Sequence, residues 1–173
     1  MHDRVGAAVG EHHRADQQAG LVGEQERDER GDLLRTARSP ERLRLITEAF
    51  VDFGITYPAF VDCGVTILRM GPALLDELSQ SALFRLGKGM TDCLARVTSV
   101  IEAGRESGEF TVEDVDLVAN MLYALGLGGL QLARLGVMVR EGSPGVPVIT
   151  RIDLAQVKRH LVESSLALVR QPL

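Results

Sequence analysis

The sequence predicts an all-α fold, and three observations support this prediction. From Ser39 onward, apolar residues recur at intervals of three and four, which places them on one face of a helix. Helix start signals such as Ser-Pro and Thr-x-x-Asp precede these periodic segments. No stretch alternates polar and apolar residues with a period of two, except the short segment VPVIT at 146–150. With 173 residues, 45% of them hydrophobic, the chain can form one domain around a hydrophobic core.

Residues 1–38 differ in composition from the rest of the chain. They contain seven large apolar side chains and five glycines, which is too little apolar surface to form a core. We therefore predict a polar tail at 1–38, disordered or forming a short helix, and a folded domain at 39–173. The tail holds three of the four histidines, but His12 and His13 are adjacent and would point to different sides of a helix. No metal site is predicted.

The first predicted helix has Ser39 as its N-cap and Pro40 as its first residue, both of which are typical of helix starts. Its apolar face carries Leu43, Ile46, Phe50, Phe53 and Tyr57. Pro58 ends this helix and opens the second, which runs to Gly71. A short helical turn is predicted at 73–78.

A long helix is predicted at 79–103. Its apolar face carries Leu83, Leu86, Met90, Leu94, Val97 and Ile101. We expect it to end near Gly104 and Gly108, because glycine is favoured just beyond the C-terminus of a helix.

The next predicted helix covers 111–140, and Thr111 and Asp114 form the T-x-x-D pattern of a capping box at its start. Its apolar face carries Val115, Val118, Leu122, Leu125, Gly129, Leu132, Gly136 and Val139. A loop is predicted at 141–150, which contains prolines and glycines. The last helix starts at Asp153. Its apolar face carries Leu154, Val157, Leu161 and Leu168.

The segment YALGLGGLQLARLG at 123–136 allows three interpretations. A nucleotide-binding glycine loop must follow a strand and open a helix, whereas these glycines lie in the middle of one. A membrane span is long enough, but Arg134 would cost about 2.5–3.5 kcal/mol near the bilayer centre. No aromatic belt flanks the segment either. We favour the third interpretation, in which the glycines let another helix approach closely.

This helix has more apolar surface than one core can cover, and the last helix shares the property. The last helix carries Val162, Leu166 and Val169 away from its main apolar face. Two such helices at the end of one small domain predict a twofold homodimer. The predicted interface residues are Leu125, Gly128, Gly129, Leu132, Gly136, Leu161 and Leu168.

Three segments in combination resemble the C-terminal half of the TetR family of bacterial transcription regulators. ERLRLITEAFVDFGITYPAF is similar to the family's first ligand-domain helix and the proline that opens the next. VTSVIEAGRESGEFTVEDVDLVANMLYALGLGGLQLARLG is similar to the long helix, its exit and the penultimate helix. DLAQVKRHLVESSLALV is similar to the last helix. The resemblance covers about residues 39–170 and implies an all-helical ligand-binding domain, which dimerises through its last two long helices as a four-helix bundle.

The resemblance also implies a pocket between the central helices for a hydrophobic or aromatic small-molecule effector. By analogy, this pocket would be lined by Phe50, Phe53, Phe60, Cys63, Thr66, Ile67, Phe84, Met90, Asn120 and Tyr123. Most of these residues are equally typical of an ordinary core. Asn120 and Tyr123 are the better candidates, because a polar group on an apolar helix needs a partner.

The family's DNA-reading head, a three-helix module, would precede Ser39. The residues there are too few and too polar to form it, and the net charge of −5 provides no basic field. We therefore expect DNA binding only if a helix-turn-helix is supplied. We expect no membrane partner and a cytoplasmic location, with Cys63 and Cys93 as reduced, buried thiols.

Two other classes of function remain open for this chain. One is an enzyme, but the sequence contains no H-E-x-x-H, G-x-S-x-G or P-loop motif, so no catalytic residue and no cofactor are predicted. Asp52 and Asp62 can face one cavity, yet such acids are usually solvated. The other class is a helical dimerisation module with a closed core. Cavity volume separates it from a sensor, because ligand pockets measure about 300–1,000 Å³.

Overall fold

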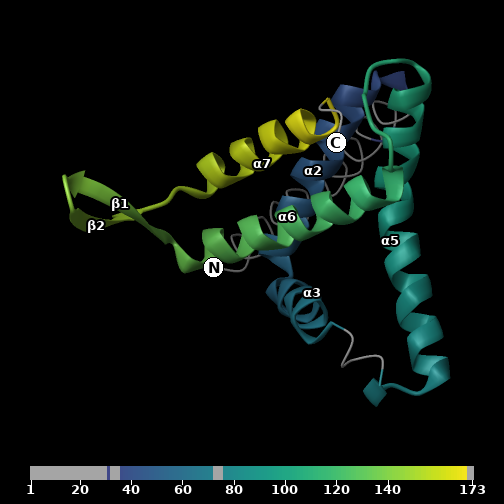
Figure 1. Ribbon diagram of the computed structural model, residues 1–173, viewed down its shortest axis with the longest axis horizontal. Helices are drawn as coiled ribbons and strands as arrows, with labels where there is room; N and C mark the ends of the chain where they lie inside the picture. The colour runs from purple at the N-terminus through teal and green to yellow at the C-terminus, as the bar shows by residue number, and fades with distance from the viewer. Residues whose placement is uncertain (1–30, 32–35, 72–75, 171–173) are drawn as a thin grey trace, which may run out of the picture. The chain divides into compact units, whose positions relative to one another are not determined.

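The computed structural model describes residue 31 and residues 36–71 and 76–170. Figure 1 labels the elements α2 (Ser39–Thr56), α3 (Pro58–Met70), α5 (Gln80–Glu106), α6 (Val115–Leu135), β1 (Val137–Ser143), β2 (Val146–Arg151) and α7 (Leu154–Leu168). This part of the chain is mostly helical, which confirms the predicted class apart from one two-stranded sheet. Most of the predicted tail at 1–38 and half of the predicted turn at 73–78 lie outside the described residues.

The start of α2 depends on a residue far away in the sequence. Arg38, and not Ser39 as predicted, takes the N-cap position, and its side chain does not cap the helix. Instead, the carboxylate of Glu109 accepts a hydrogen bond from the backbone N–H of Ser39 at 3.0 Å. The same carboxylate accepts a second hydrogen bond from Nε of Arg38. The prediction of the cap was wrong because this tertiary contact replaces a local one.

The ends of α2 and α3 follow the prediction. Pro58 is the first residue of α3, which turns by 104° relative to α2, and Gly71 closes α3 with a φ of +48°. Proline disfavours helical backbone in the residue before it, so Tyr57 lies between the two helices.

The helix α5 begins as predicted, with the Ser79 hydroxyl accepting a hydrogen bond from the N–H of Ala82 at 3.3 Å. It ends at Glu106, three residues beyond the predicted end, so Gly104 lies inside it. There the missing side chain of Gly104 makes room for the ring of Phe110, since a Cβ on Gly104 would lie 2.1 Å from Cδ2 of that ring. Gly108, with a φ of +73°, then turns the chain.

The helix α6 is capped by Asp114, whose carboxylate accepts a hydrogen bond from the N–H of Leu117 at 2.9 Å. The predicted role of Thr111 in a capping box was wrong. Its N–H donates to the carbonyl of Val169 at 2.9 Å, because the segment before α6 packs against the end of α7. Asp153 caps α7 as predicted and accepts a hydrogen bond from the N–H of Ala155 at 3.2 Å.

The segment after α6 differs from the prediction of a helix to residue 140 and a loop at 141–150. Gly136 ends α6 because its φ of +70° is left-handed, and the chain then forms the antiparallel hairpin β1–β2. Gly145, with a φ of +78°, provides the turn. Val139 pairs with Ile149, and the β-branched residues of both strands favour extended backbone.

The core consists of two apolar clusters. The first contains Leu43, Val100, Ile101, Phe110, Val112, Val115, Val118, Ala119 and Val169. The second contains Val51, Val61, Leu127, Leu130, Val157 and Leu161. Helix α2 contacts α3, α5, α6 and α7, and α6 contacts α3, α5 and α7. These two helices therefore connect the two clusters.

Among the described residues, one helix, α6, is long and apolar enough to cross a membrane by length and composition. The bent pair α2 and α3 also passes this test when taken together. Core helices of soluble proteins pass the same test, and the buried residues of α6 belong to both core clusters.

Candidate functional site

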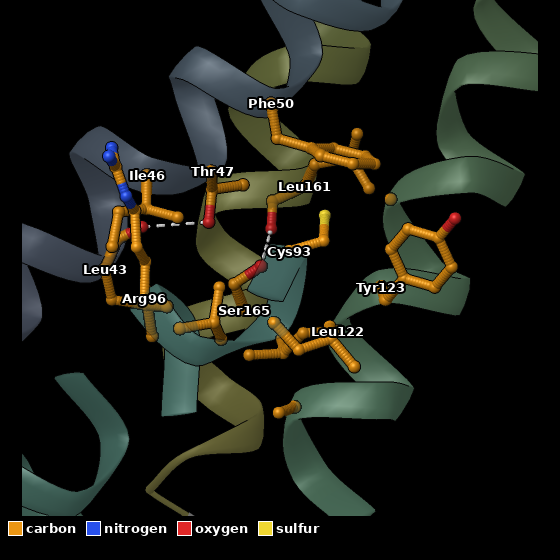
Figure 2. A pocket seen from close by; sticks show the side chains of 14 residues that line it. Leu43, Ile46, Thr47, Phe50, Cys93, Arg96, Leu122, Tyr123, Leu161 and Ser165 are labelled. Carbon is orange, nitrogen blue, oxygen red and sulfur yellow. Dashed lines mark hydrogen bonds between the residues drawn. The ribbon is translucent and has the colours of Figure 1, made fainter. Parts of the chain in front are cut away.

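A partly enclosed cavity of about 130 Å³ lies between α2, α5, α6 and α7 (Figure 2). Its lining consists of Leu43, Ile46, Thr47, Phe50, Cys93, Leu94, Arg96, Val97, Ala119, Leu122, Tyr123, Gly126, Leu161 and Ser165. Several of these residues belong to one core cluster or the other, so the cavity is a gap between the two clusters.

Helical periodicity brings these side chains together. The lining residues of each helix are three or four positions apart or adjacent, which directs them toward one side. Gly126 makes the close contact between α6 and α2 possible, since a Cβ there would lie 2.7 Å from Cε1 of Phe50. The ring of Phe50 can therefore lie against α6 and close one side of the cavity.

The aliphatic hydroxyl groups that line the cavity, those of Thr47 and Ser165, are satisfied within their own helices. The hydroxyl of Thr47 donates to the carbonyl of Leu43 at 2.9 Å, and that of Ser165 donates to the carbonyl of Leu161 at 2.7 Å (Figure 2). Neither donor is free for another partner, so the interior presents mainly apolar surface.

An aromatic cluster extends from the cavity to the corner between α2 and α3. The Phe50 ring lies edge-on to the rings of Tyr123 and Phe60, with centroid distances of 6.0 and 6.2 Å. Phe53 contacts Phe60 and Tyr57 at 5.1 and 4.7 Å. Burial raises the pKa of the Tyr123 phenol, and the nearby thiols of Cys93 and Cys63 add to this effect.

Of the ten predicted ligand-binding residues, Phe50 and Tyr123 line the cavity. Phe53 and Phe60 lie in the aromatic cluster, and Phe84 is 73% exposed. Cys63, Thr66 and Ile67 lie on α3, which does not contribute to the lining. Met90 and Asn120 line a separate surface groove between α5 and α6.

The difference between the predicted and the observed lining residues has a physical cause. Periodicity identifies the apolar face of a helix, but it does not identify the helix that this face meets. Helix α3 packs against α6 and α2 and leaves the cavity to α5 and α7. The side-chain amide of Asn120 donates to the carbonyl of Asp116 at 2.9 Å, so its polar group is satisfied locally. The two cysteines are free but exposed, so their predicted burial was wrong.

Twelve of the fourteen lining residues were not predicted to bind a ligand, and among them are Thr47, Cys93, Arg96 and Ser165. One signal was available in the sequence. Thr47 and Ser165 each follow a buried leucine by four residues, and a hydroxyl at that spacing can bond back to the leucine carbonyl. Nothing comparable marks Cys93 or Arg96.

A second feature is a row of exposed apolar side chains along α6. This row, here called the α6 stripe, contains Leu117, Met121, Leu125, Leu132 and Leu135, with exposed fractions from 38% to 67%. Their spacing places them on one face, together with Gly128, which has open space above it. A surface groove beside the stripe is lined by Met121, Leu125, Ser164, Ala167 and Leu168.

The predicted interface residues therefore fall into two groups. Leu125, Gly128 and Leu132 belong to the stripe or lie within it, and Leu168 borders the adjacent groove. The other three have roles within the chain. Leu161 is buried in the second cluster and packs against Gly129, where a Cβ would lie 2.7 Å from Cδ1 of Leu161. Gly136 ends α6.

The acids considered for catalysis are paired with cations. Asp52 accepts from Nζ of Lys158 at 2.6 Å, and Asp62 pairs with the guanidinium of Arg134. The hydrogen bond from Arg134 holds the pKa of Asp62 below its usual value. Among residues 36–71 and 76–170, no group of three or more histidine, cysteine or acidic side chains could hold a metal ion.

No known protein family, no curated protein and no solved structure matches this chain. A proposal for its function therefore depends on the cavity, on the α6 stripe and on the resemblance between sequence segments.

Proposed function

We propose that this chain is the ligand-sensing and dimerisation part of a cytoplasmic transcription regulator similar to the TetR family. Its effector is a hydrophobic or aromatic small molecule, and its protein partner is a second copy of the chain. Binding to DNA requires a helix-turn-helix that the described residues do not provide.

The observation that carries this proposal is that the same two helices border both features. Helices α6 and α7 supply Leu122, Gly126, Leu161 and Ser165 to the cavity. They also supply the α6 stripe and the groove beside it. A molecule that fills the cavity therefore contacts the same helices that would form the dimer interface. Coupling between two sites requires such a shared structural element.

The dimer is supported by the cost of leaving the α6 stripe in water. Burial of apolar surface contributes about 25 cal/mol per Å², and obligate interfaces are enriched in such surface. Small residues lie where a second helix would need to approach, namely Gly128 on α6 and Ser164 and Ala167 on α7. An antiparallel pair of these helices from each of two copies forms a four-helix bundle.

Sedimentation velocity tests the dimer with the variant Gly128→Glu. Gly128 has no atom within 4 Å of an added Cβ, so the variant should fold, but it would bury a charge in the interface. We expect the wild type to sediment as a dimer at micromolar concentration and the variant as a monomer. Gly87→Glu, an equally open position on α5, is the matched control and should remain dimeric. Gly129→Glu is unsuitable, because it would clash with Leu161 inside the chain.

A monomeric wild type, or a Gly128→Glu variant as dimeric as the Gly87→Glu control, would remove the α6 stripe from any interface. Circular dichroism must show equal helicity for both variants, so that the loss of the dimer is separated from the loss of the fold.

One observation favours a second candidate, a helical dimerisation module without a ligand. The cavity of about 130 Å³ is smaller than the pockets of about 300–1,000 Å³ that hold drug-sized ligands. If the wild type is a dimer but no small molecule raises its melting temperature, this second candidate replaces the first.

A further inference from the structure

We propose that the cavity is specific for a small aromatic carboxylate, with one ring inside and the carboxylate on Arg96. This inference rests on the proposed sensing function and narrows its ligand to one chemical class.

The volume sets the size of the ligand. An apolar cavity of about 150 Å³ in a protein core stays dry and binds benzene. The cavity described here, at about 130 Å³, therefore has room inside for one six-membered ring but not for two fused rings. The edge-on rings of Phe50 and Tyr123 at one end, with centroids 6.0 Å apart, provide faces and edges that suit an aromatic guest.

The charge of the ligand follows from the lining. Arg96 is the one charged side chain among the fourteen lining residues, and no carboxylate faces the cavity to receive a cation. Three acids on α2 and α5 already have cationic partners. Asp92 pairs with Lys88 at 2.9 Å, and both Glu41 and Glu48 pair with Arg44.

Arg96 itself forms no ion pair with any described residue of the chain. In Figure 2 its side chain extends along the side of the cavity opposite Tyr123. A planar guanidinium binds a carboxylate through two parallel hydrogen bonds, which makes it selective for that group. The proposed binding mode therefore places the ring between Phe50 and Leu122 and the carboxylate on Arg96, the one charged side chain of the lining.

A different role for Arg96 would be to cover apolar surface with its aliphatic stem while its charge stays in water. The two roles differ in their effect on ligands of equal shape. If Arg96 binds a carboxylate, the affinity for benzoate depends on Arg96 and the affinity for benzyl alcohol does not. If Arg96 only covers apolar surface, its replacement affects both affinities equally.

Isothermal titration calorimetry of the full chain with benzoate and benzyl alcohol tests this inference, using Arg96→Gln. We expect the variant to lose about tenfold or more in affinity for benzoate, because a charge-assisted pair is lost, and to bind benzyl alcohol as the wild type does. Arg85→Gln, an exposed position on α5 outside the lining, is the matched control and should bind both compounds normally.

The cysteines report where the ligand binds. Benzoate should slow the alkylation of Cys93, which lines the cavity, and leave Cys63 on α3 unaffected. The ratio of the two rates in one sample, measured by mass spectrometry, cancels differences in reagent and folding. Equal melting temperatures of the free variants confirm that they are folded.

The other outcomes separate this inference from the proposed function. If both compounds protect Cys93 and the affinity of neither changes in Arg96→Gln, the sensing function is supported and the carboxylate site is wrong. If 1-naphthoate binds as tightly as benzoate, the limit of one ring is wrong. If no compound binds or protects Cys93 at millimolar concentration, both the carboxylate site and the proposed sensing function are wrong.

Discussion

At the residue scale, Glu109 connects the start of α2 to the turn between α5 and α6. Its carboxylate receives the N–H of Ser39, Nε of Arg38 and, at 3.4 Å, the hydroxyl of Ser107. Anions stabilise helix N-termini because the first N–H groups of a helix have no partner within it. One acid thus performs the capping that the sequence pattern attributed to Ser39.

This role predicts a dependence on pH. The hydrogen bond from Arg38, followed by that from Ser39, lowers the pKa of Glu109 below its ordinary value of 4.5. Below that ordinary value the unfolded chain binds the proton more readily than the folded chain, so the stabilisation is present at higher pH and is lost as the pH falls through the folded pKa. We expect Glu109→Gln to be less stable than the wild type near about pH 7, and this difference to shrink on acidification.

Urea denaturation at a series of pH values, followed by helical circular dichroism, measures the effect. Glu106→Gln, at an exposed position three residues earlier, serves as the control and should leave the urea midpoint unchanged. A difference between Glu109→Gln and the wild type that does not vary with pH would show that the charge of Glu109 does not stabilise α2.

At the element scale, the glycines of α5 have opposite consequences for packing. Gly104 lies against the ring of Phe110, whereas Gly89 has no atom within 4 Å of an added Cβ. Both lie in the same helix, so the intrinsic gain from replacing glycine by alanine is similar, about 0.5–1 kcal/mol. The atoms around each glycine therefore determine whether its replacement by alanine raises or lowers the free energy of unfolding.

We expect Gly89→Ala to raise the free energy of unfolding by about 0.5–1 kcal/mol. Gly104→Ala should lower it by about 1–3 kcal/mol, because the Phe110 ring must move out of the first core cluster. Urea denaturation of the two variants beside the wild type provides the comparison. Equal effects of the two substitutions would mean that Phe110 does not pack on Gly104.

The starts of most helices could be predicted from the sequence, whereas the hairpin β1–β2 could not. The starts of α3, α5 and α7 were predicted because proline, serine and aspartate act locally there. The hairpin was missed because Val139 fits the predicted apolar face of a helix as well as it fits a strand. The left-handed Gly136, and not the apolar pattern, decides between these alternatives.

The candidate site was harder to predict than the helices. Phe50 and Tyr123 were identified, but Cys93, Arg96 and Ser165 reach the cavity through the way α5 and α7 pack on α2 and α6. That packing depends on small residues such as Gly126 and Gly129, whose partners are distant in sequence. Periodicity carries no information on such pairs.

At the scale of the whole molecule, the cavity and the α6 stripe occupy neighbouring faces of α6, and α7 borders both the cavity and the groove beside the stripe. Leu122 faces the cavity while its neighbour Met121 lies on the stripe, and Leu161 and Ser165 of α7 face the cavity beside the groove at Ser164. A ligand that displaces α6 or α7 by a fraction of an ångström therefore changes the surface that a second copy would meet.

Thermodynamic linkage turns this geometry into a quantitative prediction. If benzoate changes the dimer dissociation constant by some factor, dimerisation must change benzoate affinity by the same factor per coupled site, typically about 5–150-fold. The Gly128→Glu variant, which we expect to be monomeric and whose substitution lies outside the cavity lining, should then bind benzoate with an affinity shifted by that factor from the wild type. Sedimentation with and without benzoate supplies one value, and calorimetry of the variant supplies the other. If the variant binds benzoate as the dimer does, and benzoate leaves dimerisation unchanged, the cavity and the interface are independent, and occupancy of the cavity cannot be the signal that reaches a DNA-reading head.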